Sequence, residues 1–153
     1  KRFIEVCERV AANRNDFIAS CQQIVEMLSD TAAIDRKIEE QYIYLNGLAS
    51  AMQQFIRENA MHPQGEDFYD TKLAEYEKQR AEGETRLKDL QSQKAARLSR
   101  KELLDGLVKT LEESGILIDK FDERLWRLMV EKATVGTDGK LTFTLRNGME
   151  IEV

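Results

Sequence analysis

The single proline of this chain lies between two blocks of heptad repeat, and this arrangement restricts the possible folds more than any other feature of the sequence. On both sides of Pro63 and Gly65, apolar residues recur at alternating steps of four and three. That spacing places them along one face of a helix. Two such helices of similar length, joined by a short loop, fold back on each other. The sequence therefore predicts an antiparallel coiled-coil hairpin over residues 31–98, with a tip loop at about 59–67.

The repeats also predict how the two helices are aligned. Counting outward from the loop places Phe55 beside Tyr69 and brings together three positions that are not apolar, Gln41, Arg80 and Gly83. This polar layer either fixes register and orientation or is a soft point where the hairpin bends, since glycine inside a helix costs about 1 kcal/mol. The predicted interface positions are Ile34, Ile38, Gln41, Leu45, Leu48, Met52 and Phe55 before the loop, and Tyr69, Leu73, Tyr76, Arg80, Gly83, Leu87 and Leu90 after it.

The N-terminal segment, residues 1–30, is predicted to form one amphipathic helix. Its apolar seam includes Cys7 and Cys21, two heptads apart. About 21 Å of helix rise separates these thiols, too far for a disulfide, so we expect both to be buried as small apolar side chains. The repeat slips by one residue at 29–31, where either a new helix starts or one long helix continues. The seam around Phe17 packs either on the C-terminal part of the chain or on an upstream domain.

Residues 99–153 are expected to form further helices followed by a small sheet. Ser99 precedes a glutamate by three residues, the spacing of a capping box, which predicts the start of a new helix. Gly115 is the expected C-terminal cap of that helix. Asp119 or Lys120 is then expected to open a last, aromatic-containing helix.

The C-terminal stretch alternates apolar and polar residues and contains turn signals at 137–139 and 146–148. We expect each to be a three-residue loop that ends in a left-handed glycine, which pairs Phe143 with Ile151. Both loops then keep the apolar residues on one face of a three-stranded antiparallel meander. The helix around Trp126 is the nearest candidate to cover that face. The predicted fold class is therefore mainly α, with a small C-terminal β-meander packed on a helix.

The composition gives little support for DNA binding by the whole chain, metal binding, membrane insertion or catalysis. Charged residues make up 33% of the chain and the net charge is -5, so the chain as a whole does not match DNA electrostatically. With two cysteines and one histidine, we expect no metal and no other cofactor in this chain. No apolar run approaches the roughly 20 residues of a membrane span. Asp119, Asp122 and Glu123 are interpreted as charges at a helix start, and we expect neither catalytic residues nor a small-molecule substrate.

One stretch of the chain is locally basic, although the net charge of the whole chain is negative. It contains Lys94, Arg97, Arg100 and Lys101. These side chains either contact DNA phosphates, which would add a salt-dependent increment to binding, or form an ordinary solvated helix face.

Three segments of the chain resemble large serine recombinases of the transposon and phage type. The tip and returning arm of their coiled coil are similar to FIRENAMHPQGEDFYDTKLAEYEKQ, and their C-terminal end is similar to FDERLWRLMVEKATV and DGKLTFTLRNGMEIEV. The order is the same, and together the segments extend the resemblance over essentially the whole chain. The C-terminal motif is the more specific part, because heptads occur in many proteins.

This resemblance implies that the chain is the non-catalytic coiled-coil region that follows the zinc ribbon of a site-specific DNA recombinase. Such proteins cut DNA through a serine in an N-terminal domain, and zinc is expected only in the upstream ribbon. The coiled coil would contact other subunits of the same recombinase during synapsis and control the direction of recombination, while the parent protein binds DNA. The implied location is the cytoplasm, with a bacterial, phage or mobile-element gene. The contact residues implied at the tip are Met61, His62, Pro63 and Phe68.

A stand-alone coiled-coil scaffold or adaptor, unrelated to recombination, is the alternative. It explains the heptads and the acidic balance equally well. It gives no reason for the C-terminal meander.

Overall fold

The structure, a computed structural model, describes residues 1–114 and 121–153. The chain is mainly α-helical and ends in a small three-stranded antiparallel sheet, so the predicted fold class is confirmed. The expected cap at Gly115 and the expected helix start at Asp119 or Lys120 lie outside the described residues. In chain order the elements are α1 (Arg2–Ala12), α2 (Arg14–Ser29), α3 (Ala32–Met61), α4 (Glu66–Ser114), α5 (Glu123–Met129), β1 (Val130–Val135), β2 (Leu141–Leu145) and β3 (Glu150–Glu152).

The described chain divides into two compact units. Thr31–Ala96 form the first, which we call the hairpin unit. Lys1–Asp30 and Arg97–Val153 together form the second, the terminal unit. The N-terminal helices therefore share a unit with the C-terminal sheet, although the whole hairpin separates them in sequence.

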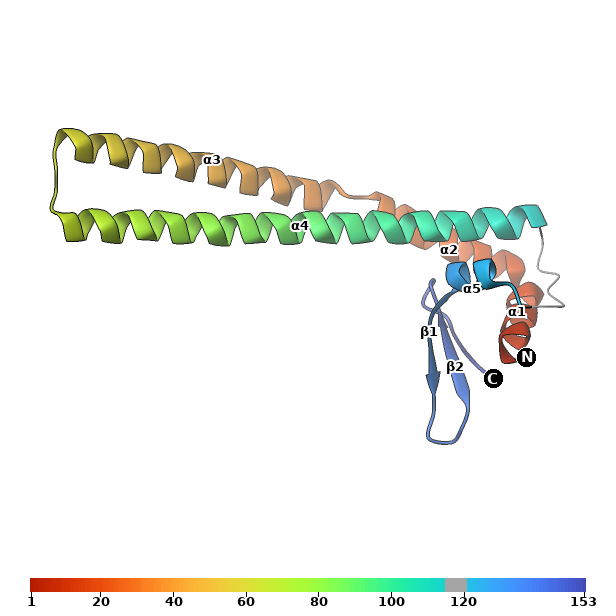
Figure 1. Cartoon of the computed structure of the whole chain (residues 1–153). Helices are drawn as coiled ribbons and strands as arrows, with labels where there is room; N and C mark the ends of the chain where they lie inside the picture. The colour runs from red at the N-terminus through yellow and green to blue at the C-terminus, as the bar shows by residue number, and fades with distance from the viewer. Residues whose placement is uncertain (115–120) are drawn as a thin grey trace. The chain divides into compact units, whose positions relative to one another are not determined.

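In the hairpin unit, α3 and the first part of α4 run antiparallel and are joined by a tight turn (Figure 1). Between α3 and α4 only residues 62–65 are outside the helices, so the tip loop is shorter than the 59–67 expected from the sequence. Gly65 has a φ of 60°, a left-handed conformation that glycine adopts without strain. This residue reverses the chain directly before α4 begins.

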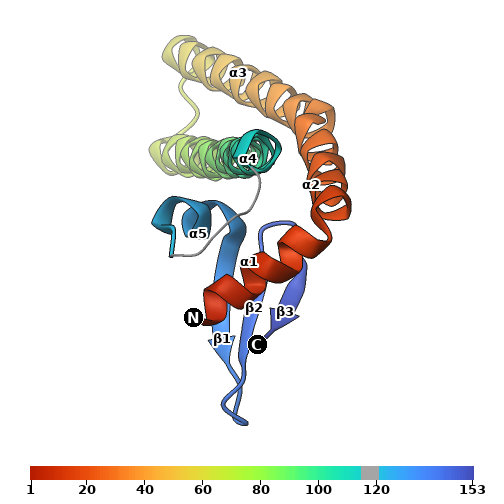
Figure 2. The same cartoon turned by 90° about the vertical axis from the view of Figure 1, so that its right-hand side faces the viewer.

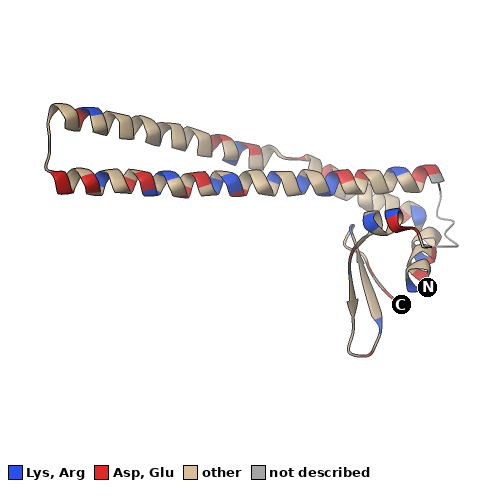
Figure 3. Cartoon of the chain, viewed as in Figure 1, with Lys and Arg blue, Asp and Glu red and all other residues tan. Residues whose placement is uncertain are grey.

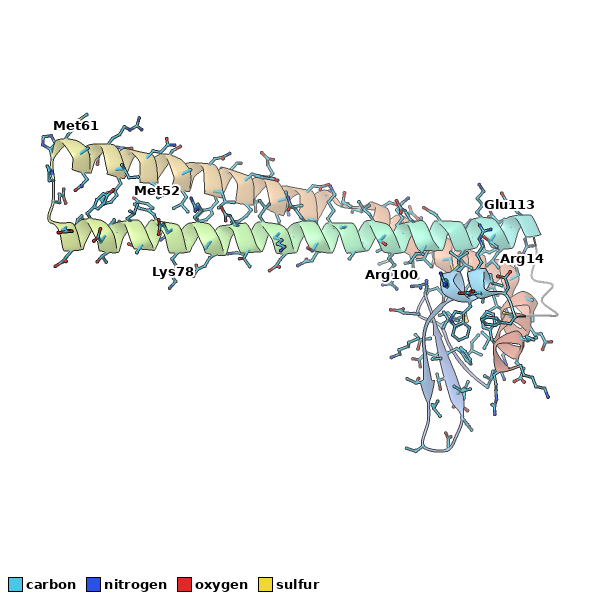
Figure 4. The ribbon with its side chains drawn as sticks, viewed as in Figure 1. Arg14, Met52, Met61, Lys78, Arg100 and Glu113 are labelled. Atoms are coloured by element: carbon cyan, nitrogen blue, oxygen red, sulfur yellow. The ribbon has the colours of Figure 1, made fainter. Side chains whose placement is uncertain are left out.

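The predicted alignment of the two helices is confirmed at two separate points. Near the tip, the rings of Phe55 and Tyr69 stack with their centroids 5.5 Å apart. Farther along, Gln41 Nε2 donates a hydrogen bond of 3.3 Å to the carbonyl oxygen of Gly83. Met52, a predicted interface residue, lies between the helices (Figure 4). The heptad spacing therefore determines the register along the hairpin.

One predicted interface residue faces solvent instead. Arg80 is exposed, and its Nε lies 3.6 Å from Glu84 Oε1 on the next turn of α4. Gln79 is half-buried in its place. A guanidinium is costly to desolvate between two apolar helices, so the interface uses the neighbouring amide and leaves the charge in water. Lys78 likewise points away from α3 (Figure 4).

The N-terminal segment is not the single helix expected over residues 1–30. Asn13, at φ -120° and ψ 35°, separates α1 from α2. Both helices still bury the predicted seam, since Cys7 and Cys21 are no more than 1% exposed. A second break at residues 30–31 separates α2 from α3, so the slip in the repeat does start a new helix.

Helix α4 is longer than expected. It continues through Ser99 without a break, so the new helix predicted from the capping-box spacing is wrong. The reason is that buried or half-buried positions continue in steps of three and four through Lys94, Arg97, Lys101 and Leu104. A helix whose packed face is uninterrupted has no physical cause to end there.

The sheet has the strand order β1-β2-β3, and both turns have the predicted form. Gly139 and Gly148 have φ values of 78° and 85°. Phe143 lies opposite Ile151, as expected for a three-residue loop. A bulge in β1 keeps Val130 on the same apolar face as the core residues of β2.

The apolar face of the sheet is covered by α5 and α1 together. Trp126 of α5 contacts Phe143 edge-on with centroids 5.7 Å apart, which confirms the expected cover. Phe3 of α1 contacts Trp126 at 4.9 Å, and α1 crosses the sheet (Figure 2). Phe17 is 1% exposed in the same core, so its seam packs on the C-terminal part of the chain. Val135 is 72% exposed at the far end of β1, beyond this cover.

Candidate functional site

The tip of the hairpin presents apolar side chains to solvent. Met61, the last residue of α3, is 75% exposed, and Phe68, in the first turn of α4, is 53% exposed. His62 and Pro63, between them in sequence, are also exposed. We call these four residues the tip surface. Exposed apolar side chains at the end of a helical hairpin are candidates for contact with another protein.

A cluster of aromatic rings supports this tip surface. The ring of Phe55 contacts Phe68 edge-on with centroids 6.4 Å apart, and it lies 5.7 Å from the ring of Tyr76. Contacts of this kind contribute about 1 kcal/mol each beyond the area they bury. Phe68 therefore has one side held by the interior of the hairpin and the other side in water.

Hydrogen bonds fix the backbone of the turn. The His62 amide donates to the carbonyl oxygen of Glu58 at 2.8 Å, and the Gln64 amide donates to Asn59 Oδ1 at 3.2 Å. A partner that binds this turn would not have to order a loose loop, which removes one cost of association.

The two lysines of the basic stretch have carboxylate partners. Lys94 Nζ lies 2.6 Å from Asp35 Oδ1, across the two helices of the hairpin unit. The hydrogen bond from Lys94, followed by one from Thr31, holds the pKa of Asp35 below its usual value. Lys101 Nζ lies 2.9 Å from Asp105 Oδ2 on its own helix.

The two arginines of the stretch donate to backbone carbonyls within the terminal unit. Arg97 Nε donates to Leu28 O at 3.2 Å, and its Nη2 donates to Met27 O. Both acceptors belong to the last turn of α2, whose carbonyls have no partner inside the helix. Arg100 Nη2 donates to Arg146 O at 3.1 Å. All four cations of the basic stretch thus have partners within the chain.

Arg14 is the residue whose role sequence reasoning missed. Its Nε donates to Leu111 O at 3.0 Å and its Nη2 to Glu112 O at 3.2 Å, at the C-terminal end of α4 (Figure 4). The available signal was a guanidinium at a seam position where an apolar residue is expected. Sequence alone does not show which carbonyls such a group reaches.

A second exposed surface lies on α3. Residues 41–56 contain no Lys, Arg, Asp or Glu, and the middle of α3 contrasts with the charged residues spread along α4 (Figure 3). Ile43 is 63% exposed, and Tyr42 and Tyr44 are 43% and 41% exposed. These three residues are consecutive, so they point about 100° apart around the helix, and Tyr42 Oη accepts a hydrogen bond of 3.0 Å from Gln91 Nε2 of α4. We call the uncharged stretch of residues 41–56 the α3 face. An uncharged, partly apolar helix face is suited to contact with another helix.

The carboxylates at the start of α5 have structural roles. Asp122 Oδ1 accepts a hydrogen bond of 3.0 Å from the Leu125 amide and caps the helix. Glu123 pairs with Arg127 at 2.6 Å. The interpretation as charges at a helix start is confirmed for both, while Asp119 lies outside the described residues.

The cysteines show no sign of a reactive site. Burial raises the pKa of both Cys7 and Cys21 to about 11, and the charges of Asp122 and Glu8 add to the shift at Cys7. Such thiols are protonated and unreactive at neutral pH. Within residues 1–114 and 121–153, no group of His, Cys, Asp and Glu could hold a metal ion. None of the helices described is long and apolar enough to cross a bilayer.

Comparison of the chain with protein-family models, with curated proteins and with solved structures finds no match.

Proposed function

We propose that this chain is the C-terminal coiled-coil region of a large serine recombinase, and that it holds recombinase subunits together during synapsis. In this proposal the chain is not catalytic. An upstream serine domain of the parent protein cuts the DNA, and an upstream ribbon holds zinc. The observation that supports the proposal best is the tip surface, where Met61 and Phe68 are exposed on a turn fixed by its own hydrogen bonds.

The length of the hairpin suits such a role. Helix α3 has 30 residues, so its two ends lie about 45 Å apart. A contact site at the end of such an arm can reach a subunit that the rest of the protein does not touch. Two identical tip surfaces can meet around a twofold axis, because each then buries the same residues. If the hairpins of two subunits met in one arrangement of the DNA sites but not in another, they would control the direction of recombination.

DNA binding is assigned to the parent protein in this proposal. Lys94, Arg97, Arg100 and Lys101 are engaged within the chain. Phosphates would compete with these partners for the four cations. The variants that follow are therefore expected to leave DNA affinity unchanged.

The test replaces both apolar residues of the tip surface in the full-length parent protein, Met61→Ser with Phe68→Ser. Each purified variant is incubated with one and with two DNA sites, and complexes are separated on native gels. Binding to a single site should be unchanged, and the complex that joins two sites should be lost. Met27→Ser is the matched control, since Met27 is 69% exposed but lies in the terminal unit. Normal synapsis by the tip variant would reject the tip as the contact site.

A coiled-coil scaffold is the second candidate, and the α3 face favours it. An uncharged face over residues 41–56 could pair with a helix of another protein. The gene sequence upstream of the codon for Lys1 separates the two candidates. A serine-recombinase catalytic domain followed by ribbon cysteines would support the first, and an upstream region without them would support the second.

A further inference from the structure

The sheet of the terminal unit ends in an outer strand, β3, and some backbone groups of this strand point away from its neighbour β2. Leu141 and Val153 exchange both backbone hydrogen bonds, at 3.1 and 2.8 Å. In an antiparallel ladder the hydrogen-bonded pairs alternate with pairs whose N–H and C=O groups point outward. Glu150 and Glu152 are therefore the residues of β3 that direct their backbone groups away from β2. Among the strands that the structure describes, β3 is the last in the order, so these groups lie on an edge with no further strand beside it.

One of these outward groups already has a donor from another element. Arg9 Nη1, on α1, donates to the carbonyl oxygen of Glu152 at 2.8 Å. This contact occupies an acceptor that an added strand would otherwise use, so Glu150 is the residue of β3 whose outward groups an added strand would pair with. It also shows that the edge accepts donors from the side on which α1 lies.

A groove of about 380 Å³ runs along this edge. One wall is formed by residues 149–152, and the other by the bend between α1 and α2, with Val10, Asn13 and Phe17. The end of α1 that leads into α2 lies beside β3 (Figure 2). Val10 and Phe17 are buried behind this wall, so the groove offers an extended segment the partly exposed side chain of Met149 and the outward backbone groups of β3.

The charges around the groove are mainly acidic. Its lining contains the carboxylates of Asp16, Glu150 and Glu152, and a single cation, Arg9. Glu152 Oε1 is paired with Lys140 Nζ at 2.5 Å. Within the part of the chain that the structure describes, Asp16 and Glu150 have no salt-bridge partner, so they are the carboxylates available to a basic ligand.

We propose that the free edge of β3 and this groove bind an extended, basic segment of a partner protein by strand addition. The segment would pair with the backbone of Glu150 in the way that peptides add to sheet edges. Every second side chain would lie on the polar face, where Lys or Arg faces Glu150. The alternate side chains would be apolar and pack on Met149, which is 40% exposed. A helix could not use the outward backbone groups, and an acidic strand would be repelled. The inference does not depend on the proposed function.

The test is an NMR titration of the 15N-labelled full chain with a peptide of alternating Lys and Val. Amide shifts are expected at Glu150, Glu152 and the bend around Asn13. The same peptide, N-methylated at the amides that would face β3, should bind about tenfold more weakly, because each lost hydrogen bond leaves a group unpaired. A Glu–Val peptide should not bind. Equal binding by the methylated peptide, or the absence of any shift along β3, would overturn strand addition.

A pair of protein variants tests the role of the groove carboxylates separately. Asp16→Asn combined with Glu150→Gln should weaken binding of the Lys–Val peptide by about threefold to tenfold, the size expected for opposed charge pairs across strands. Glu131→Gln, on the opposite edge strand β1, is the matched control and should leave binding unchanged. Thermal unfolding of each variant establishes that it is folded. If the control weakened peptide binding equally, or if the double variant did not weaken it, the carboxylates of Asp16 and Glu150 would not be what selects a basic segment.

Discussion

Arg14 and Arg97 each bind the last carbonyls of the helix on which the other lies. Arg14 begins α2 and donates to Leu111 of α4, and Arg97 lies on α4 and donates to Leu28 of α2. Neither helix has a basic residue in its own last turn. Since these carbonyls have no partner inside the helix and bear partial negative charge, the two guanidiniums satisfy both helix ends and favour an antiparallel pair.

Replacing Arg97 should destabilise the terminal unit. Arg97→Met keeps most of the aliphatic length but removes both donors, so we expect the free energy of unfolding to fall by about 1–2 kcal/mol. Arg97→Lys should recover only part of this, because an ammonium lacks the fork that reaches two acceptors. Urea unfolding followed by circular dichroism measures the change. Arg36→Met, at an exposed position of α3, is the control and should change stability by less than about 0.5 kcal/mol. Equal effects of the two methionine variants would contradict the assigned role.

The two glycines of the hairpin helices should respond differently to alanine. Nothing lies within 4 Å of a Cβ added at Gly47, whereas a Cβ at Gly83 would lie 2.7 Å from Leu45 Cδ2 and 3.1 Å from Gln41 Nε2. Gly47→Ala should therefore stabilise by about 1 kcal/mol through helix propensity. Gly83→Ala should fall short of that by about 1 kcal/mol or more, because Leu45 has to move. Urea unfolding of both variants gives the comparison. Equal stabilisation would favour the view of Gly83 as a point where the hairpin bends.

The sequence alone predicted the structure correctly where the relevant structural rule involves only neighbouring residues. The stacking of Phe55 on Tyr69 follows from counting heptads away from one turn, and heptads fix register without knowledge of distant residues. The conformations of Gly139 and Gly148 follow in the same way from the length of each loop and the strand alternation around it. Met61 was likewise identifiable as a tip residue from its distance to the proline.

The sequence alone did not predict the features of the fold that depend on residues far apart along the chain. The break at Asn13 ends α1, whose Phe3 contacts Phe121 and Trp126 near the other end of the sequence. The spacing at Ser99 satisfied a local helix-start rule, yet the continuous packed face of α4 overrode it. The sequence also left the role of the basic stretch open, because residue spacing does not show that Arg97 reaches backbone carbonyls of α2.

Stability should decrease at alkaline pH because of the buried thiols. The pKa of Cys7 and Cys21 rises from 9.0 to about 11 on folding. Below pH 9 both states keep the protons and stability is unaffected. Between about pH 9 and 11 the unfolded chain loses protons that the native chain retains, so the free energy of unfolding should fall by about 1.4 kcal/mol per pH unit for each thiol. Urea unfolding at a series of pH values measures this slope.

The double variant Cys7→Ala with Cys21→Ala provides the control, because it removes both thiols and leaves the rest of the chain unchanged. Its stability is lower throughout from lost packing, but its slope between pH 9 and 11 should be shallower than that of the natural chain. Identical slopes would show that the thiols are not the groups responsible.

The turn between β2 and β3 should require glycine at its last position. Gly148 has a φ of 85°, where a Cβ is strained, although nothing lies within 4 Å of the position a Cβ would take. Gly148→Ala should therefore lower the free energy of unfolding by about 1–2 kcal/mol through backbone strain alone. Gly148→Asn should lower it less, because asparagine tolerates positive φ better than alanine. Thermal unfolding of the two variants gives the comparison. If alanine were tolerated as well as asparagine, the left-handed residue would not be what fixes this turn, and the pairing of Phe143 with Ile151 would have to be set by the core instead.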